Sequence, residues 1–221
     1  MSSSARLLLD GRSSPARNMA IDEALLRHAK VPVLRIYGWE SSCVSIGYFQ
    51  KTGVVGSGRT FVRRYTGGGL VEHGEDLTYT LVLPLDHPLT TAGTLPSYRS
   101  IHQAIAHALK DCGIECRLAT AQPKKDDPSC FLNPVPADVL DDGGIKLAGA
   151  AQRRTKQGCL HQGSILLPGG IPTVLKKALI SQMEICLNAS LTESSISEAE
   201  KRMSEELESN RYSTKEWNFS R

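Results

Sequence analysis

Apolar residues recur along the chain at two spacings, and each spacing predicts a different kind of element. Between residues 96 and 113 they fall three or four residues apart, which is the period of one helix face. The apolar members of this predicted helix are Ile101, Ala104, Ile105, Ala108, Leu109 and Cys112. A second helix is expected from Asn18, its N-cap, to about residue 30, with Asp22 and Glu23 in its first turn.

Alternating or β-branched stretches predict strands through the first three quarters of the chain. These stretches are residues 5–10, 31–39, 42–49, 60–64, 76–84, 114–119, 137–140, 145–154 and 158–167. From Pro172 onward the pattern turns helical, over residues 173–189 and 195–212. Strands interrupted by a few helices predict one α+β domain over residues 1–221, with a helical C-terminal segment from about residue 172.

Composition narrows the class of protein without indicating a reaction. The 221 residues are 40% hydrophobic and carry a formal net charge of +3, which is typical of a globular domain. The sequence has no Lys/Arg tract and no basic stripe with aromatic residues, so no nucleic-acid partner is expected. No apolar run approaches the ~20 residues of a membrane-spanning helix, so no membrane partner is expected. The six cysteines are scattered, which favours reduced thiols and a cytoplasmic location.

The sequence RRYTGGGLVEHG places Arg63 and Arg64 before three consecutive glycines, Gly67–Gly69, with His73 four residues further on. Three bare residues in a row indicate that something lies close against the main chain there. The spacing fits neither a Walker A loop nor the G-x-G-x-x-G fingerprint. Free N–H groups on this turn could hold an anion or a polarised carbonyl beside the arginines. A hairpin with a glycine bulge and solvated arginines explains the motif equally well.

Three side chains are candidates for the chemistry. His73 could act as an acid or base or orient a substrate, although a single histidine is more often structural. Cys130 follows a polar loop, whereas the other cysteines fall in strand-like or helical segments typical of buried thiols. Lys146, in the sequence GIKLAG, is flanked by apolar and small residues and could lower the pKa of the Cys130 thiol. The sequence contains no C-x-x-C pair, so neither a metal site nor a cofactor is expected.

Several longer motifs resemble, in their order, the biotin/lipoate protein ligase and octanoyltransferase family. They are NMAIDEALL, RIYGWESSCVSIGYFQ, RRYTGGGLVEHGEDLTYTLVLP, IKLAGAAQRR, HQGSILL and EWNFSR, which together span nearly the whole chain. The resemblance implies a mixed, largely antiparallel β-sheet flanked by helices, the catalytic-domain fold of biotin ligases and class II aminoacyl-tRNA synthetases. It is greatest to the octanoyltransferases that form a cysteine thioester.

This resemblance implies a reaction and a set of residues. Octanoyl-acyl carrier protein would be the donor, Cys130 the acyl-accepting nucleophile and Lys146 the group that activates it. A lysine of a lipoyl domain, such as that of the glycine-cleavage H protein, would be the acceptor. The implied substrate-binding residues are Arg63, Arg64, Thr66, Gly67, Gly68, Gly69, His73, Tyr79, Gly149, Ala150, Gln152, His161 and Gly163.

Three alternatives remain open from the sequence. The first is an ATP-dependent lipoate–protein ligase, in which the glycine loop and Lys146 hold an adenylate and no cysteine is needed. The second is an amidotransferase that moves lipoyl groups between lipoyl domains through a cysteine. The third is a non-catalytic homologue that binds acyl groups.

Overall fold

A mixed sheet of eight strands carries most of the apolar core. The computed structural model describes residues 3–120 and 134–221, and the strands of this sheet lie in the order β11-β1-β2-β6-β10-β9-β8-β7. Their bounds are β1 Ser3–Ser13, β2 Val33–Trp39, β6 Leu77–Pro84, β7 Arg117–Leu118, β8 Val139–Leu140, β9 Lys146–Thr155, β10 Gly158–Ile165 and β11 Ala189–Glu193. Both pairings of β1 are parallel and the remaining ones are antiparallel. The predicted α+β fold with a largely antiparallel sheet is confirmed.

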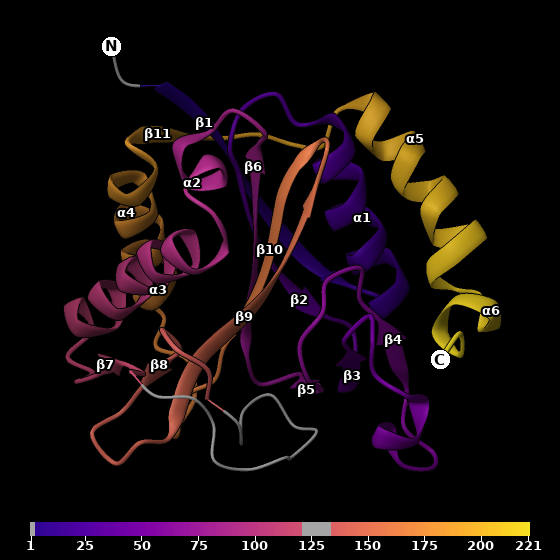
Figure 1. Ribbon diagram of the computed structural model, residues 1–221, viewed down its shortest axis with the longest axis horizontal. Helices are drawn as coiled ribbons and strands as arrows, with labels where there is room; N and C mark the ends of the chain where they lie inside the picture. Colours follow the sequence, from indigo (N-terminus) through magenta and orange to yellow (C-terminus); the bar gives the residue numbers. More distant parts are fainter. Residues whose placement is uncertain (1–2, 121–133) are drawn as a thin grey trace.

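Helices cover both faces of this sheet (Figure 1). On one face lie α3 Thr94–Asp111 and α4 Leu175–Leu187, which pack on each other. On the other lie α1 Pro15–His28 and α5 Glu198–Leu207, which also pack together. Short helical turns complete the described chain: Thr52–Val55, α2 Pro88–Thr91, Glu208–Tyr212 and α6 Lys215–Asn218. No helix within residues 3–120 and 134–221 is long and apolar enough to cross a membrane.

A smaller sheet of three strands lies beside the α1 face of the large sheet. Its strands are β3 Cys43–Ile46, β4 Phe61–Arg63 and β5 Val71–His73, in the order β4-β3-β5. The glycine-rich sequence connects β4 to β5, so it forms a loop between sheet elements as predicted. The buried apolar side chains that support this sheet are Val44, Ile46, Val55 and Leu70.

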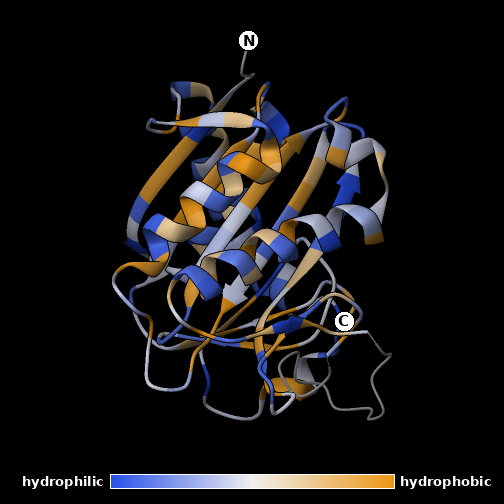
Figure 2. Cartoon of the chain, turned by 90° about the vertical axis from the view of Figure 1, so that its left-hand side faces the viewer, coloured by the Kyte–Doolittle hydropathy of each residue, from blue (hydrophilic) through white to orange (hydrophobic). Residues whose placement is uncertain are grey.

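The period of the apolar residues predicts α3 correctly. Ile101, Ile105 and Leu109 are fully buried in the main core, together with Leu81 and Leu83 of β6. Figure 2 shows the same separation, with apolar residues concentrated on the strands and mixed with hydrophilic ones along the helices. The helix ends where Gly113 takes a positive φ of 76°, a backbone angle that favours glycine.

Two predicted boundaries are wrong. Helix α1 begins at Pro15, because the Ser14 hydroxyl accepts a hydrogen bond from the Arg17 amide and caps the helix four residues before Asn18. The C-terminal segment is not helical throughout, because the chain leaves α4 through Asn188 in the left-handed region, with φ 48°. Residues 189–193 then form β11 at the sheet edge, in parallel register with β1.

Because α1 begins at Pro15, Asp22 lies in the interior of the helix and not in its first turn. The Asp22 side chain points towards the large sheet. Its carboxylate is fully buried and accepts hydrogen bonds from Arg35 at 2.8 Å and Thr80 at 2.7 Å. Tyr37 and Gln162 also donate to it, at 3.0 and 2.7 Å. Buried ions are tolerated when they are paired and their remaining hydrogen-bonding sites are filled. This cluster therefore fixes α1 to three strands of the large sheet.

We expect Asp22→Ala to lower the free energy of unfolding by about 3–5 kcal/mol, because it leaves the Arg35 guanidinium buried without its main partner. The matched control is Asp10→Ala. Asp10 also pairs with Arg35, at 2.6 Å, but its side chain is 30% exposed and water can replace it, so the expected loss is ~0–1 kcal/mol. Urea unfolding followed by circular dichroism measures both. Equal losses in the two variants would contradict this account.

Candidate active site

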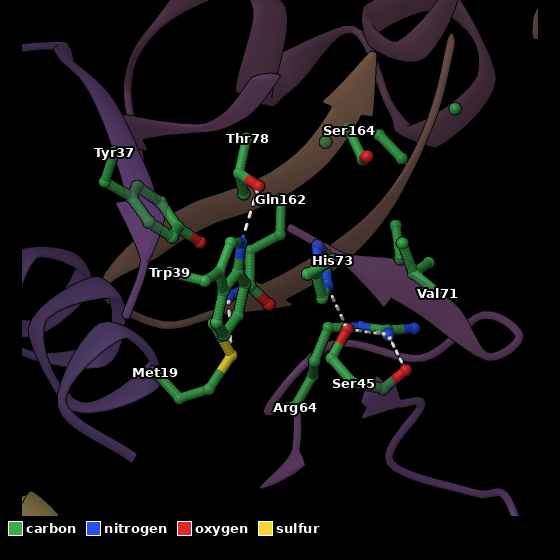
Figure 3. A pocket seen from close by; sticks show the side chains of 14 residues that line it. Met19, Tyr37, Trp39, Ser45, Arg64, Val71, His73, Thr78, Gln162 and Ser164 are labelled. Atoms are coloured by element: carbon green, nitrogen blue, oxygen red, sulfur yellow. Dashed lines mark hydrogen bonds between the residues drawn. The ribbon is translucent and has the colours of Figure 1, made fainter. Parts of the chain in front are cut away.

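A pocket lies between the large sheet and the small sheet. One row of directly opposed residues crosses its floor from β9 to β2: Gly149, Ser164, Thr78 and Tyr37. Met19 of α1 and Trp39 of β2 add apolar surface, and Ser45, Arg64 and His73 come from the small-sheet side (Figure 3).

The Arg64 side chain holds the glycine loop over the floor. Its guanidinium donates to the carbonyl oxygens of Gly67 at 2.9 Å, Gly69 at 2.7 Å and Ser45 at 2.8 Å. Gly68 lies above Ala151 of β9, with φ +81°. On its other side the loop touches the main chain of Gly47, where a Cβ would collide with the Gly68 carbonyl. The bare loop is therefore explained in part by the protein's own backbone.

Arg63 faces away from the pocket and lies outside the described pocket lining. It is fully buried, and its guanidinium donates to main-chain carbonyls of the β3–β4 connection and of the C-terminal helix. The acceptors are Gly47, Tyr48, Gln50, Trp217 and Asn218. Arg63 thus joins the β3–β4 connection to the C-terminal helix, away from the pocket where a substrate contact was expected.

His73 is joined on both sides within the pocket wall. Its Nε2 lies 2.7 Å from the Ser45 hydroxyl, and its Nδ1 lies 2.9 Å from the Asp76 carboxylate. Trp39 stacks on the imidazole with the ring centroids 4.1 Å apart. Of these residues the sequence singled out only His73, because Ser45 comes from a strand almost thirty positions earlier and nothing in the local pattern connects them.

Asp76 is an ionised carboxylate. Burial alone would raise the pKa of Asp76, but hydrogen bonds from His73, Ser164 and Thr78 outweigh that effect and lower the pKa below its ordinary value. The two hydroxyls donate to the same oxygen, Oδ2, at 2.6 Å from Ser164 and 2.7 Å from Thr78. Because both belong to the floor row, Asp76 links the wall of the pocket to its floor.

Lys146 lies at the β9 end of that row. Its side chain passes over Gly149, where a Cβ would collide with the Lys146 Cε and Nζ atoms. The ammonium pairs with Asp138 at 2.7 Å, and both side chains are almost completely buried. The apolar and small neighbours of Lys146 are visible in the sequence, whereas its acidic partner is not.

Asp138 is itself fixed by neighbours. The Tyr98 hydroxyl of α3 donates to it at 2.5 Å and accepts from the Ala150 amide at 2.9 Å, so one phenol joins Asp138 to the pocket-lining strand. Ala137, just before Asp138, has a positive φ of 71°, which is rare for a residue with a Cβ. His102 donates to the Ala137 carbonyl at 2.8 Å and helps to hold this conformation. Backbone strain of this kind often accompanies functional sites.

Tyr79, Gln152 and His161, which the resemblance implied as substrate contacts, lie on the α3 face of the sheet and outside the described pocket lining. Burial lowers the pKa of His161 to about 3, so its imidazole is uncharged at neutral pH. The Tyr79 hydroxyl forms a hydrogen bond with His161 Nε2 at 3.0 Å. The Tyr79 ring occupies the space that a side chain at Gly163 would need. Thr66 does not line the described pocket itself, but its hydroxyl donates at 2.7 Å to Gln162, which does.

The cysteines divide into five described thiols and Cys130, which lies outside the described residues. The five are Cys43, Cys112, Cys116, Cys159 and Cys186. Burial raises the pKa of each, to about 12 for Cys43, with a further contribution from Asp76, and to about 11 for Cys186. These thiols are therefore protonated at neutral pH and poor nucleophiles.

Comparisons with known proteins agree with this geometry. The model of the lipoyl protein ligase A/B catalytic domain matches residues 14–210. An octanoyltransferase LipM of Brevibacillus brevis is 30% identical over 98% of this chain and 99% of its own length. Those of Moorella thermoacetica and Bacillus subtilis are 38% and 36% identical over 73% of this chain, but the matches span only 64% and 65% of those proteins.

Solved structures share the fold along the whole chain. A protein of T. acidophilum described as a lipoate protein ligase, with bound lipoic acid, superposes with a TM-score of 0.79 at 26% identity. A lipoate-protein ligase A bound with ATP gives a TM-score of 0.75, also at 26% identity. Each match covers 99% of both chains.

We expect Gly149→Ala to drive the Lys146 side chain out of its enclosed position, because the added methyl group occupies the path of Cε and Nζ. Overpacking of this kind costs about 1–3 kcal/mol, which thermal unfolding measures. An amine-reactive label followed by peptide mass spectrometry should modify Lys146 in the variant and spare it in the parent. Gly53→Ala is the control, since a Cβ there meets nothing within 4 Å. Protection of Lys146 in Gly149→Ala would contradict the collision.

Proposed function

The chain belongs to the lipoyl protein ligase A/B catalytic domain family, and on this premise we propose that it is an octanoyltransferase. It takes an octanoyl group from octanoyl-acyl carrier protein, holds it as a thioester on Cys130, and passes it to a lysine of a lipoyl domain. The observation that carries the proposal is an apolar pocket whose lining residue Gly149 contacts an enclosed lysine, in a chain similar to octanoyltransferases along nearly its whole length.

The pocket suits a saturated acyl chain. Met19, Tyr37, Trp39 and Val71 supply apolar surface, and residues 149–151 leave the β9 side open because they carry at most a methyl group. Each methylene buried there stabilises the bound chain by about 0.8 kcal/mol. An eight-carbon chain therefore binds tightly enough to be selected over much shorter ones.

Lys146 is the proposed activating group for the acyl carbonyl. Its ammonium ends beside Gly149, at the edge of the pocket, where it would stabilise negative charge on the carbonyl oxygen and on an incoming thiolate. Asp138 offsets part of this charge, so its main contribution is to hold the ammonium in place.

Cys130 is the proposed nucleophile for two reasons. The resemblance to octanoyltransferases that form a cysteine thioester implies this residue, and the other thiols are less suited to the role. The five described cysteines have raised pKa values, which supports assigning the chemistry to the sixth. Exchange between two thioesters is nearly balanced in free energy, and conversion of a thioester to an amide is downhill. The two-step transfer therefore requires no ATP.

An ATP-dependent lipoate–protein ligase is the second candidate, because the solved structures with lipoic acid and with ATP are described as ligases. In that reaction the same pocket and Lys146 would hold lipoyl-adenylate. Pyrophosphate exchange into ATP that depends on lipoate would favour the ligase. Absence of that exchange, with turnover of octanoyl carrier protein, would favour the transferase.

We expect incubation with octanoyl-acyl carrier protein to add one octanoyl group to the protein and Cys130→Ser to abolish this adduct. Intact-mass spectrometry measures the adduct directly. The control is Cys112→Ser, which removes a half-buried thiol of raised pKa and should acylate normally. An unchanged adduct in Cys130→Ser would refute the assignment of the nucleophile.

Lys146→Ala should slow acylation by about 10²–10³-fold, the usual effect of losing one oxyanion donor. Lys156→Ala, at the exposed turn between β9 and β10, is the matched control and should retain the parent rate. Rapid-quench measurement of acyl-enzyme gives the rates, and circular dichroism checks the fold. Near-normal acylation in a folded Lys146→Ala protein would remove Lys146 from the mechanism.

A further inference from the structure

The residues Ser45, His73 and Asp76 form one hydrogen-bonded line in the pocket wall, and the transfer described above gives that line no task. We propose that it is the proton relay of the amide-forming step. Ser45 receives a proton from the attacking amine and passes its own to His73, while Asp76 holds and stabilises the imidazole. The inference rests on the proposed acyl transfer and deepens it by assigning its base.

The direction of each hydrogen bond follows from the chemistry of the partners. The Ser45 hydroxyl has two described partners, His73 Nε2 and the Arg64 guanidinium, both at 2.7 Å. A guanidinium only donates, so with an uncharged imidazole the serine proton points to His73 Nε2. Ionised Asp76 only accepts, so His73 Nδ1 carries its proton towards Asp76. Nε2 is therefore left as the basic nitrogen, facing the serine.

This is the order of hydroxyl, imidazole and carboxylate that serves general-base catalysis in acyl transfer. The Asp76 carboxylate stabilises the imidazolium that forms when His73 accepts a proton. The carboxylate and the ring are held in place from other strands, by the hydroxyls of Thr78 and Ser164 and by stacking on Trp39. The base is therefore fixed before substrate arrives.

The relay and Lys146 contact neighbouring residues of the pocket floor. Ser164, which donates to Asp76, lies directly opposite Gly149 in the sheet, and Lys146 passes over Gly149. A carbonyl bound beside Gly149 would lie next to the Lys146 ammonium, in the same pocket that Ser45 and His73 line. The two sets then act on different atoms, the ammonium on the oxygen and the relay on the nitrogen.

His73 also borders open space on its far side. It lines a second hollow of about 480 Å³ together with Ser42, Cys43, Leu166, residues 58–60 before β4, and Glu72 and Glu75 in and after β5. Glu72 and Glu75 line the same hollow and are polar enough to keep it hydrated. The imidazole ring therefore lies between the acyl pocket and a second hollow.

The step balances as follows. The uncharged acceptor amine forms a C–N bond to the acyl carbon, and the C–S bond of the thioester breaks with its electron pair on sulfur. The amine gives one proton to Ser45 Oγ, and Ser45 gives its own to His73 Nε2. The imidazolium afterwards returns that proton to the thiolate or to water, which restores the starting state.

The test separates the two halves of the reaction. Octanoyl-enzyme is prepared from the parent, Asp76→Asn and Ser45→Ala proteins, and its decay is followed with lipoyl-domain acceptor and with hydroxylamine. Hydroxylamine cleaves thioesters in neutral solution without a catalyst. We expect both variants to lose about 100-fold or more in transfer to the lipoyl domain and less than threefold in the hydroxylamine reaction. Asp86→Asn, an exposed site away from the pocket, should behave as the parent.

Each outcome decides the question. Equal slowing with both nucleophiles would mean that the line is only structural and would overturn the relay, as would normal transfer in Ser45→Ala. An octanoyl ester on Ser45 in the Cys130→Ser background, detected by peptide mass spectrometry, would make Ser45 a nucleophile instead and would also overturn it. If no acyl-enzyme forms in the parent, the proposed transferase function fails first. Ser45→Ala keeps the test valid if Asp76→Asn does not fold.

Discussion

The site depends on one close approach, that of the Lys146 side chain to the bare Cα of Gly149. Any side chain at Gly149 would occupy the same space, so this position admits only glycine while the lysine stays enclosed. An enclosed ammonium needs a partner, and Asp138 is that partner. Asp138 in turn brings Tyr98 of α3 against β9. One steric requirement thus connects a helix, a strained turn and a pocket-lining strand.

The opposite wall of the pocket is built on the same principle of satisfied buried charge. Asp76 is ionised because three donors converge on it, and those donors come from β5, β6 and β10. Arg64 satisfies carbonyl groups of the glycine loop while it also donates to Ser45. The polar groups therefore hold one another in fixed directions, and little reorganisation is needed when a substrate charge develops between them.

Local patterns predicted the elements better than the contacts between them. The apolar stripe of α3 and the alternation in β6 are local signals, and both elements formed as expected. Asn18 was mistaken for the cap of α1, which Ser14 provides, with Pro15 as the first helical residue. The residue types and their neighbours pointed to Lys146 and His73, and the resemblance to a family implied roles for them. Asp138, Asp76 and Ser45 were missed, because their importance comes from partners on other strands.

The two consecutive arginines show how one motif serves two purposes. Successive residues of a strand point to opposite faces, so Arg63 and Arg64 leave the end of β4 in opposite directions. Arg64 reaches the pocket and holds the glycine loop, whereas Arg63 holds the C-terminal helix α6 through the carbonyls of Trp217 and Asn218. Asn218 accepts in return from the Arg63 amide. The terminal segment therefore supports the end of β4, from which the glycine loop starts.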